Sequence, residues 1–224
     1  FIFGSVITCA LALAIATPFS LATAIFMTEI SPELGKRFVQ PAVEIFVGIP
    51  SVVYGWIGLT ILVPLIKNIF NLRFGFSVLA AGIVLAVMIF PTITSLAADA
   101  LRSIPKSYRA ASYGLGATRW QTIAKVVVPA AVTGLMTAVI LGLARAFGEA
   151  LAVAMVIGKM RAFPTSLLAP TNNLTAAIAA DMGGAMEGSE YNIALWTMAL
   201  LLFIISLACI FAIHFLTAKG GKQA

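Results

Sequence analysis

Two opposite charges lie inside the apolar run GLARAFGEALAV, at Arg145 and Glu149. A charge at the centre of a membrane helix costs at least about 2.5–3.5 kcal/mol on the insertion scale. Residues four apart share a helix face, so mutual neutralisation is one explanation, although arginine before glutamate is the less favourable order. The other explanation is that the guanidinium binds an anion, because its planar fork matches pairs of phosphate oxygens. We favour anion binding, with Glu149 holding the arginine in the absence of the anion or moving with it.

The stretch GIPSVVYG at 48–55 is a second candidate site. Pro50 should break a helix there, and broken helices inside membranes often present backbone N–H groups to anions. Ser51 and Tyr54 would add hydroxyl donors beside this break. The alternative is helix packing around a proline kink.

Composition indicates which elements position these side chains. The chain of 224 residues is 61% hydrophobic and 10% charged, with a mean hydropathy of +1.07. Its apolar stretches exceed the roughly 20 residues that cross a bilayer as a helix. We therefore expect an all-α, polytopic membrane helix bundle. Its five predicted spans are Phe1–Met27, Ala42–Ile66, Ser77–Leu101, Val126–Gly158 and Tyr191–Thr217. Proline or glycine interrupts most of them, at Pro18, Pro50, Pro64, Pro91, Gly142 and Gly148.

The distribution of basic residues predicts the orientation of the bundle. One set of loops carries Lys36, Arg37, Arg102, Lys106, Arg109, Arg119, Lys125, Lys219 and Lys222. The opposite set carries Lys67, Arg73, Lys159 and Arg161. Basic loops remain in the cytoplasm, so the first set is predicted to be inside. The net charge of +6 is then explained by topology, and no nucleic-acid partner is expected. The first span would begin outside, so we also expect at least one upstream helix.

Two loops stand out in this topology. Residues 103–125 are predicted to be a cytoplasmic helix-turn-helix, with Gly114 and Gly116 in its turn. The apolar side chains of this loop that could anchor a soluble partner are Tyr113, Leu115 and Trp120. Residues 159–190 are predicted to be an outer loop, with a short helix near Leu174–Ala180. Its acidic residues that could meet an external partner are Asp181, Glu187 and Glu190. An ordinary solvated loop is the alternative in both cases.

The cytoplasmic loop also carries a family resemblance. AASYGLGATRWQTIAKVVVPAA, at 110–131, is similar to the coupling motif of ABC importer permeases, an EAA triplet followed by a glycine and an I-x-L-P ending. Ala110 stands where that motif has glutamate, and Gly116 matches its glycine. The remaining matches are Ala111 and Ser112 in the triplet and Val126, Val128 and Pro129 in the ending. The resemblance implies that this segment, including Gly114, Arg119 and Trp120, docks on an ATPase subunit.

Two further stretches narrow the resemblance. GIPSVVYG and RAFGEALAVAMVIG resemble phosphate-specific ABC permeases, the PstC-type subunit more than its PstA-type partner. Lys159 follows the second stretch where PstC-type chains usually have asparagine. The resemblance implies a type I importer fold for 1–224 as a single permease domain in the bacterial cytoplasmic membrane.

The same resemblance implies the function and the partners. The chain would form half of a phosphate path beside a PstA-type subunit, and an extracytoplasmic phosphate-binding protein would deliver the anion. The sequence has no Walker phosphate loop, zinc-type ligand spacing or Ser-His-Asp arrangement. We therefore expect no covalent catalysis and no cofactor in this chain, with ATP and Mg²⁺ bound by a dimer of ATPase subunits. The residues alone leave open sulfate or molybdate as the anion, an ion-gradient-driven transporter or channel, and a membrane anchor or sensor.

Overall fold

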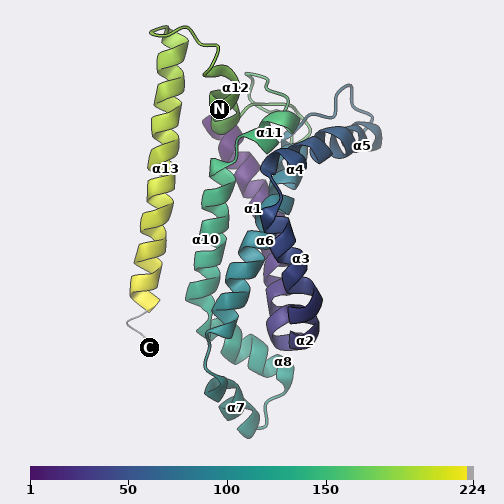
Figure 1. The fold of residues 1–224 in the computed structure, drawn as a ribbon, viewed down its shortest axis with the longest axis vertical. Helices are drawn as coiled ribbons and strands as arrows, with labels where there is room; N and C mark the ends of the chain where they lie inside the picture. Colours follow the sequence, from purple (N-terminus) through teal and green to yellow (C-terminus); the bar gives the residue numbers. More distant parts are fainter. Residues whose placement is uncertain (221–224) are drawn as a thin grey trace. The chain divides into compact units, whose positions relative to one another are not determined.

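The structure is a computed structural model, and it describes residues 1–220. Lys222, one of the basic residues counted above, lies outside the described residues. The regular elements within 1–220 are helices, of which those marked η are short π-helical segments. In chain order (Figure 1) they are α1 (Ile2–Ile25), η1 (Phe26–Ile30), α2 (Pro32–Leu34), η2 (Gly35–Val39), α3 (Gln40–Gly48), α4 (Ser51–Ile57), η3 (Gly58–Leu62), α5 (Val63–Ile69), α6 (Val78–Arg102), α7 (Lys106–Gly114), α8 (Arg119–Thr122), η4 (Ile123–Val127), α9 (Val128–Ala130), α10 (Val132–Gly148), α11 (Leu151–Val156), α12 (Leu174–Asp181) and α13 (Glu190–Gly220).

The chain divides into two compact units. Unit 1 comprises Phe1–Ala16, Ile49–Ile89 and Leu143–Ile210. Unit 2 comprises Thr17–Gly48, Phe90–Gly142 and the chain from Phe211 onwards. The chain passes from one unit to the other several times along its length. The first four of these boundaries lie at or near Pro18, Pro50, Pro91 and Gly142, which the sequence marked as helix interruptions.

The length and apolar character of the helices confirm an all-helical membrane architecture. Four helical stretches within the described residues are long and apolar enough to cross a bilayer: Ile2–Ile30, Ser51–Ile69, Val78–Arg102 and Glu190–Ala208. A bent pair, Arg119–Ala130 with Val132–Gly148, would make a fifth. The predicted first and third spans agree with this set to within three residues. The predicted fifth span begins one residue after Glu190 and lies within α13.

The predicted second and fourth spans are not continuous helices, and their breaks at Pro50 and after Gly148 are among the interruptions that the sequence marked. Helix α3 ends at Gly48, and a new helix begins only at Ser51. Pro50 explains this break, because it has no N–H to donate and disfavours helical geometry in the residue before it. The fourth stretch bends by 67° beside Ala131 and is interrupted again after Gly148. A single straight helix over Val126–Gly158 therefore does not form.

Close contacts between helices hold unit 1 together. Helix α11 packs against α4 on one side and α12 on another (Figure 1). A Cβ atom added to Gly55 of α4 would lie only 2.8 Å from the Cα atom of Ala152 in α11. Val153 and Val156 of α11 are fully buried. The small residues Gly55 and Ala152 therefore let the two backbones approach closely.

Unit 2 contains the helical hairpin of α7 and α8. These two helices pack against each other, and α7 also contacts η4. Leu101 at the end of α6 and Val127 in η4 are fully buried within this unit. The residues that flank the hairpin are therefore well packed, whereas most of the hairpin's own surface is exposed.

Candidate functional site

Arg145 lies in the last turn of α10 and is half-buried. It is 13 residues after the start of α10 at Val132, or roughly 20 Å along the helix at about 1.5 Å per residue. The helix ends three residues later, at Gly148, so Arg145 does not lie in a continuous helix that extends to Gly158. A cation in the last turn is stabilised by the partial negative charge of the helix C-terminus. The fold therefore offsets part of the cost of burying this guanidinium.

Glu149 lies just after the end of α10, so it does not share a continuous helix face with Arg145. Its carboxylate Oε1 accepts a hydrogen bond of 3.0 Å from the backbone N–H of Ala152 and thereby caps the start of α11. Its backbone carbonyl accepts a hydrogen bond of 2.7 Å from Thr175 Oγ1 of α12. The helical backbone stops at Gly148, so the continuous helix face on which the alternative of mutual neutralisation rests does not form. A role for Glu149 in gating remains a prediction.

Tyr54 and Arg145 come together from separate elements. Tyr54 is buried on α4, with 8% of its surface exposed. The Arg145 guanidinium lies close enough for its charge to act on the phenol hydroxyl. Ser51, the first residue of α4, is half-buried and one turn away on the same helix. The arrangement joins a cation and a hydroxyl next to a helix break, and such groups can bind an oxyanion.

Lys159 follows this region in a left-handed backbone conformation, with φ of 53°. Gly158 before it also has a positive φ, of 95°. Asparagine adopts left-handed geometry more readily than lysine. The asparagine that PstC-type chains usually carry at this position therefore fits the local backbone.

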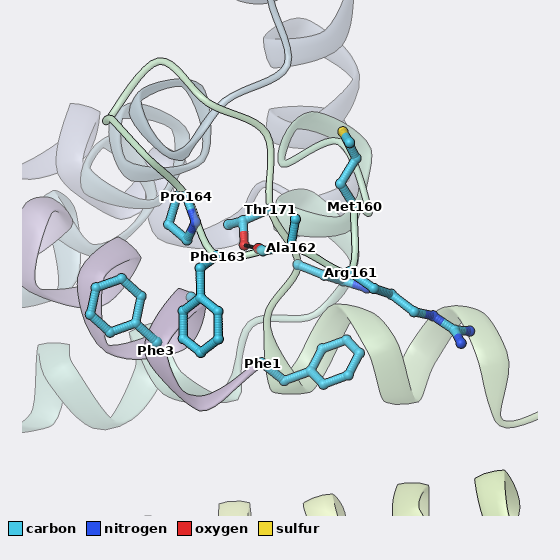
Figure 2. Close-up of a pocket in the computed structure, with 10 residues that line it drawn as sticks. Phe1, Phe3, Met160, Arg161, Ala162, Phe163, Pro164 and Thr171 are labelled. Atoms are coloured by element: carbon cyan, nitrogen blue, oxygen red, sulfur yellow. Dashed lines mark hydrogen bonds between the residues drawn. The ribbon is translucent and has the colours of Figure 1, made fainter.

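A small pocket of about 120 Å³ lies between α1 and the loop after Lys159. Figure 2 shows the rings of Phe3 and Phe163 at its edge, with centroids 5.9 Å apart. Thr171 Oγ1 donates a hydrogen bond of 2.9 Å to the carbonyl of Ala162 within its lining. The guanidinium of Arg161 points away from these groups (Figure 2). The pocket is thus lined mainly by aromatic and neutral polar groups and offers little to hold an anion.

The acidic residues of the outer loop have different environments. Asp181 accepts hydrogen bonds from Arg161, at 3.3 Å, and from the hydroxyl of Tyr191. Arg161 also lies 4.4 Å from the centre of the Tyr191 ring. Glu187 and Glu190 are exposed. The predicted short helix is confirmed as α12, whereas the Asp181 carboxylate is used within the chain, which the sequence did not indicate.

The hairpin at the predicted cytoplasmic loop has the expected turn. Gly116 has φ of 82°, a conformation that favours glycine, while Gly114 ends α7. Thr118 caps α8 in a reciprocal capping box with Gln121. Ser112 and Thr122 join the two helices through a buried hydroxyl pair 2.9 Å apart. These bonds make the hairpin a defined unit.

The outer face of the hairpin is apolar and exposed. Leu115 is 90% exposed and Trp120 66% exposed, and Tyr113 is exposed as well. Ala111, Leu115 and Val126 help to line an open groove of about 530 Å³. Ala110 is exposed, and Pro129 lies just before the bend at Ala131. Exposed aromatic and aliphatic side chains around a groove are typical of a protein-docking surface.

Arg119 and the adjacent Arg109 have partners that the sequence did not indicate. Arg109 binds the carboxylate of Glu29 with two nitrogen atoms, and Arg119 donates to the carbonyls of Glu29 and Ile30. Glu29 is 80 residues before Arg109, so no local spacing rule connects them. A signal in the sequence that could have indicated this contact is the position of Glu29, an acidic residue at the end of a span that a basic loop follows.

Within the described residues, no cluster of three or more histidine, cysteine, aspartate or glutamate side chains has the arrangement of a metal site.

Known proteins resemble this chain along nearly its whole length. A family model for the inner membrane component of binding-protein-dependent transport systems matches residues 16–219. The probable ABC transporter permease protein YqgH of Bacillus subtilis is 55% identical over 219 residues, covering 98% of this chain and 71% of that protein. The phosphate transport system permease protein PstC of Haemophilus influenzae is 39% identical, covering 92% and 70%. A chain of the MetNI methionine ABC transporter, in an inward-facing structure, has a TM-score of 0.70 at 21% identity, covering 97% and 91%.

The apolar helices define a membrane-protein fold, and the exposed hairpin adds a surface typical of protein docking. The chain belongs to the family of binding-protein-dependent transport system inner membrane components, and it is an ABC transporter permease subunit. It is a non-catalytic, multi-pass component of the inner membrane. Its family implies an ATPase and a binding protein as partners. This membership decides against the ion-gradient-driven transporter and the membrane anchor that the residues alone left open.

Proposed function

We propose that the chain is the PstC-type permease subunit of a phosphate importer and forms half of the anion path. The observation that carries this proposal is the Arg145 guanidinium beside the buried Tyr54, at the point where α10 ends. PstC proteins of Haemophilus influenzae and Mesorhizobium japonicum are 39% and 37% identical to this chain, which supports phosphate as the cargo.

In this proposal Arg145 meets the phosphate as it crosses the membrane. A guanidinium can bind two phosphate oxygens at once, and the hydroxyl groups of Ser51 and Tyr54 can donate to the others. Binding has to stay weak, because the anion must leave on the other side. Glu149 would compete for Arg145 in the empty state, which requires its carboxylate to leave the start of α11.

The proposed partners follow from the surfaces of the chain. The exposed face of residues 103–125 docks on an ATPase subunit, and a dimer of these subunits holds ATP and Mg²⁺, so this chain needs no cofactor of its own. The missing carboxylate at Ala110 removes one polar contact from that interface. A PstA-type subunit completes the path. A phosphate-binding protein docks at the outer loop, where Glu187 and Glu190 are exposed.

Uptake by the reconstituted complex tests this function. The importer is placed in vesicles with its ATPase and binding protein, and uptake of labelled phosphate, sulfate and molybdate is measured. Phosphate should enter only with ATP, and Arg145→Ala should reduce uptake at least tenfold, since a lost charge-assisted hydrogen bond costs about 1.5–3 kcal/mol. The complex should still assemble, because Arg145 is only half-buried.

Arg73→Ala is the matched control. Arg73 is an exposed arginine in the loop between α5 and α6, so its removal changes the net charge equally and should leave uptake unchanged. Uptake of sulfate or molybdate in place of phosphate would assign the path to another oxyanion. Normal phosphate uptake by Arg145→Ala would refute the role of this arginine.

A further inference from the structure

We propose that Glu29 is a positioning residue that fixes the α7–α8 hairpin to the cytoplasmic end of the first membrane helix. Through this attachment, movement of the hairpin is transmitted to that helix. The inference rests on the proposed docking of residues 103–125 on the ATPase, but not on the identity of the transported anion.

The first contact joins α7 to the carboxylate of Glu29 in η1. Arg109 Nε donates to Oε2 at 3.1 Å, and Arg109 Nη2 donates to Oε1. The same guanidinium donates to the carbonyl of Ile104 at 2.8 Å and to the carbonyl of Leu101 at 3.1 Å. One side chain therefore connects α7, the end of α6 and the end of the first helix. Such a fork fixes direction as well as distance.

The pair is well shielded from water. The Glu29 side chain is 9% exposed and that of Arg109 is 20% exposed. Hydrogen bonding to Glu29 raises the pKa of Arg109 above its ordinary value, in opposition to burial. Loss of one partner would leave a buried charge without compensation, which makes the geometry costly to change.

The second contact joins α8 to the backbone of the same residue. Arg119 Nη2 donates to the carbonyls of Glu29 and, at 2.7 Å, of Ile30. These carbonyls lie at the end of a helical stretch, where backbone acceptors have no helical partner. Glu29 is thus held through its side chain by α7 and through its backbone by α8.

The hairpin is internally rigid enough to act through these contacts. The buried hydroxyl pair of Ser112 and Thr122 joins its helices, and the capping box at Thr118 fixes the start of α8. A displacement of the apolar outer face would therefore move both arginines together. Since both bind Glu29, the end of the first helix has to follow or the ion pair has to break. This chain has Ala110 where the coupling motif has glutamate, and Glu29 supplies a carboxylate to the hairpin from elsewhere in the chain.

The test compares transport with ATP hydrolysis in the complete complex in vesicles. In Glu29→Gln, which keeps the side-chain shape, the ratio of anion taken up to ATP hydrolysed should fall about tenfold, within the usual range for coupling between two sites. The amount of ATPase bound to the permease should stay the same, because the outer face of the hairpin is untouched. Glu29→Asp, which keeps the charge, should recover part of the ratio.

A double-mutant cycle assigns the effect to the ion pair. If Glu29 acts through Arg109, the double variant Glu29→Gln with Arg109→Gln should be no worse than the single variants. Glu33→Gln removes a nearby exposed carboxylate of α2 and should leave the ratio unchanged. A normal ratio in Glu29→Gln would overturn the proposal. Failure of both Glu29→Gln and Glu29→Asp to assemble would also overturn it, by assigning Glu29 to folding. The ratio of anion taken up to ATP hydrolysed is measured with whichever anion the wild type transports. Transport of an anion other than phosphate would therefore refute the proposed function and leave the role of Glu29 testable.

Discussion

Replacing Gly55 by alanine tests how tightly the site is packed. A Cβ atom at this position would lie 2.8 Å from Ala152 Cα, 2.8 Å from Met155 Sδ and 3.2 Å from Ala152 O. The Met155 side chain can move, but the Ala152 contacts are to backbone. Ordinary carbon–carbon contact is about 3.5–4.0 Å, so α4 and α11 would have to separate by about 0.7 Å or more.

The expected cost of this substitution is about 1–3 kcal/mol, as for other insertions into a packed interior. In a chain of this size that corresponds to a loss of roughly 2–12 °C in the apparent Tm of the purified complex. Uptake should fall as well, because Gly55 follows Tyr54 directly and a shift of α4 would move that hydroxyl relative to Arg145. Thermal unfolding in detergent and uptake in vesicles measure the two effects.

Gly48 provides a control within the same motif. A Cβ atom there would have no atom within 4 Å, so Gly48→Ala should leave the apparent Tm unchanged or slightly raised. Gly55→Ala with a wild-type Tm would refute the close packing of α4 on α11. A lowered Tm with unchanged uptake would refute the link between this packing and the Tyr54 position.

Two further substitutions test local features. Lys159→Asn should raise the apparent Tm by a few degrees, because left-handed geometry costs an ordinary residue roughly 1–2 kcal/mol and asparagine tolerates it better; a lower Tm would contradict this. Leu115→Ser should weaken retention of the ATPase on the permease by roughly tenfold or more. Docking would bury the exposed Leu115 side chain, and full burial of a leucine contributes about 1.5–3 kcal/mol. Met186→Ser, at an equally exposed outer position, should have no such effect, and equal retention in both variants would refute the docking surface.

Features that depend on neighbouring residues were predictable from the sequence. The apolar lengths gave the third and fifth spans, and Pro50 gave the break before α4. The turn at Gly116 and the helix α12 also followed from local patterns. Each of these depends on hydrophobic length, on a missing N–H group or on allowed backbone angles, which a short stretch of sequence contains.

Features that depend on where a helix stops were predicted less well. Arg145 and Glu149 are four residues apart, but the break after Gly148 gives them different surroundings. A glycine near a helical pattern permits a break without requiring one, so spacing alone supported a shared face. The capping bond from Ala152 to Glu149 became evident only in the folded backbone.

The sequence by itself determined that the chain is a helical membrane protein with one unusual arginine and a hairpin that carries apolar side chains, because hydrophobic length and charge are local properties. Only the tertiary structure decided which groups these residues meet. Tyr54 approaches Arg145, and Glu29 holds Arg109 across 80 positions of sequence. Such pairings depend on how separate helices pack. The spacing of residues along the sequence does not determine how far apart the side chains of two separate helices lie.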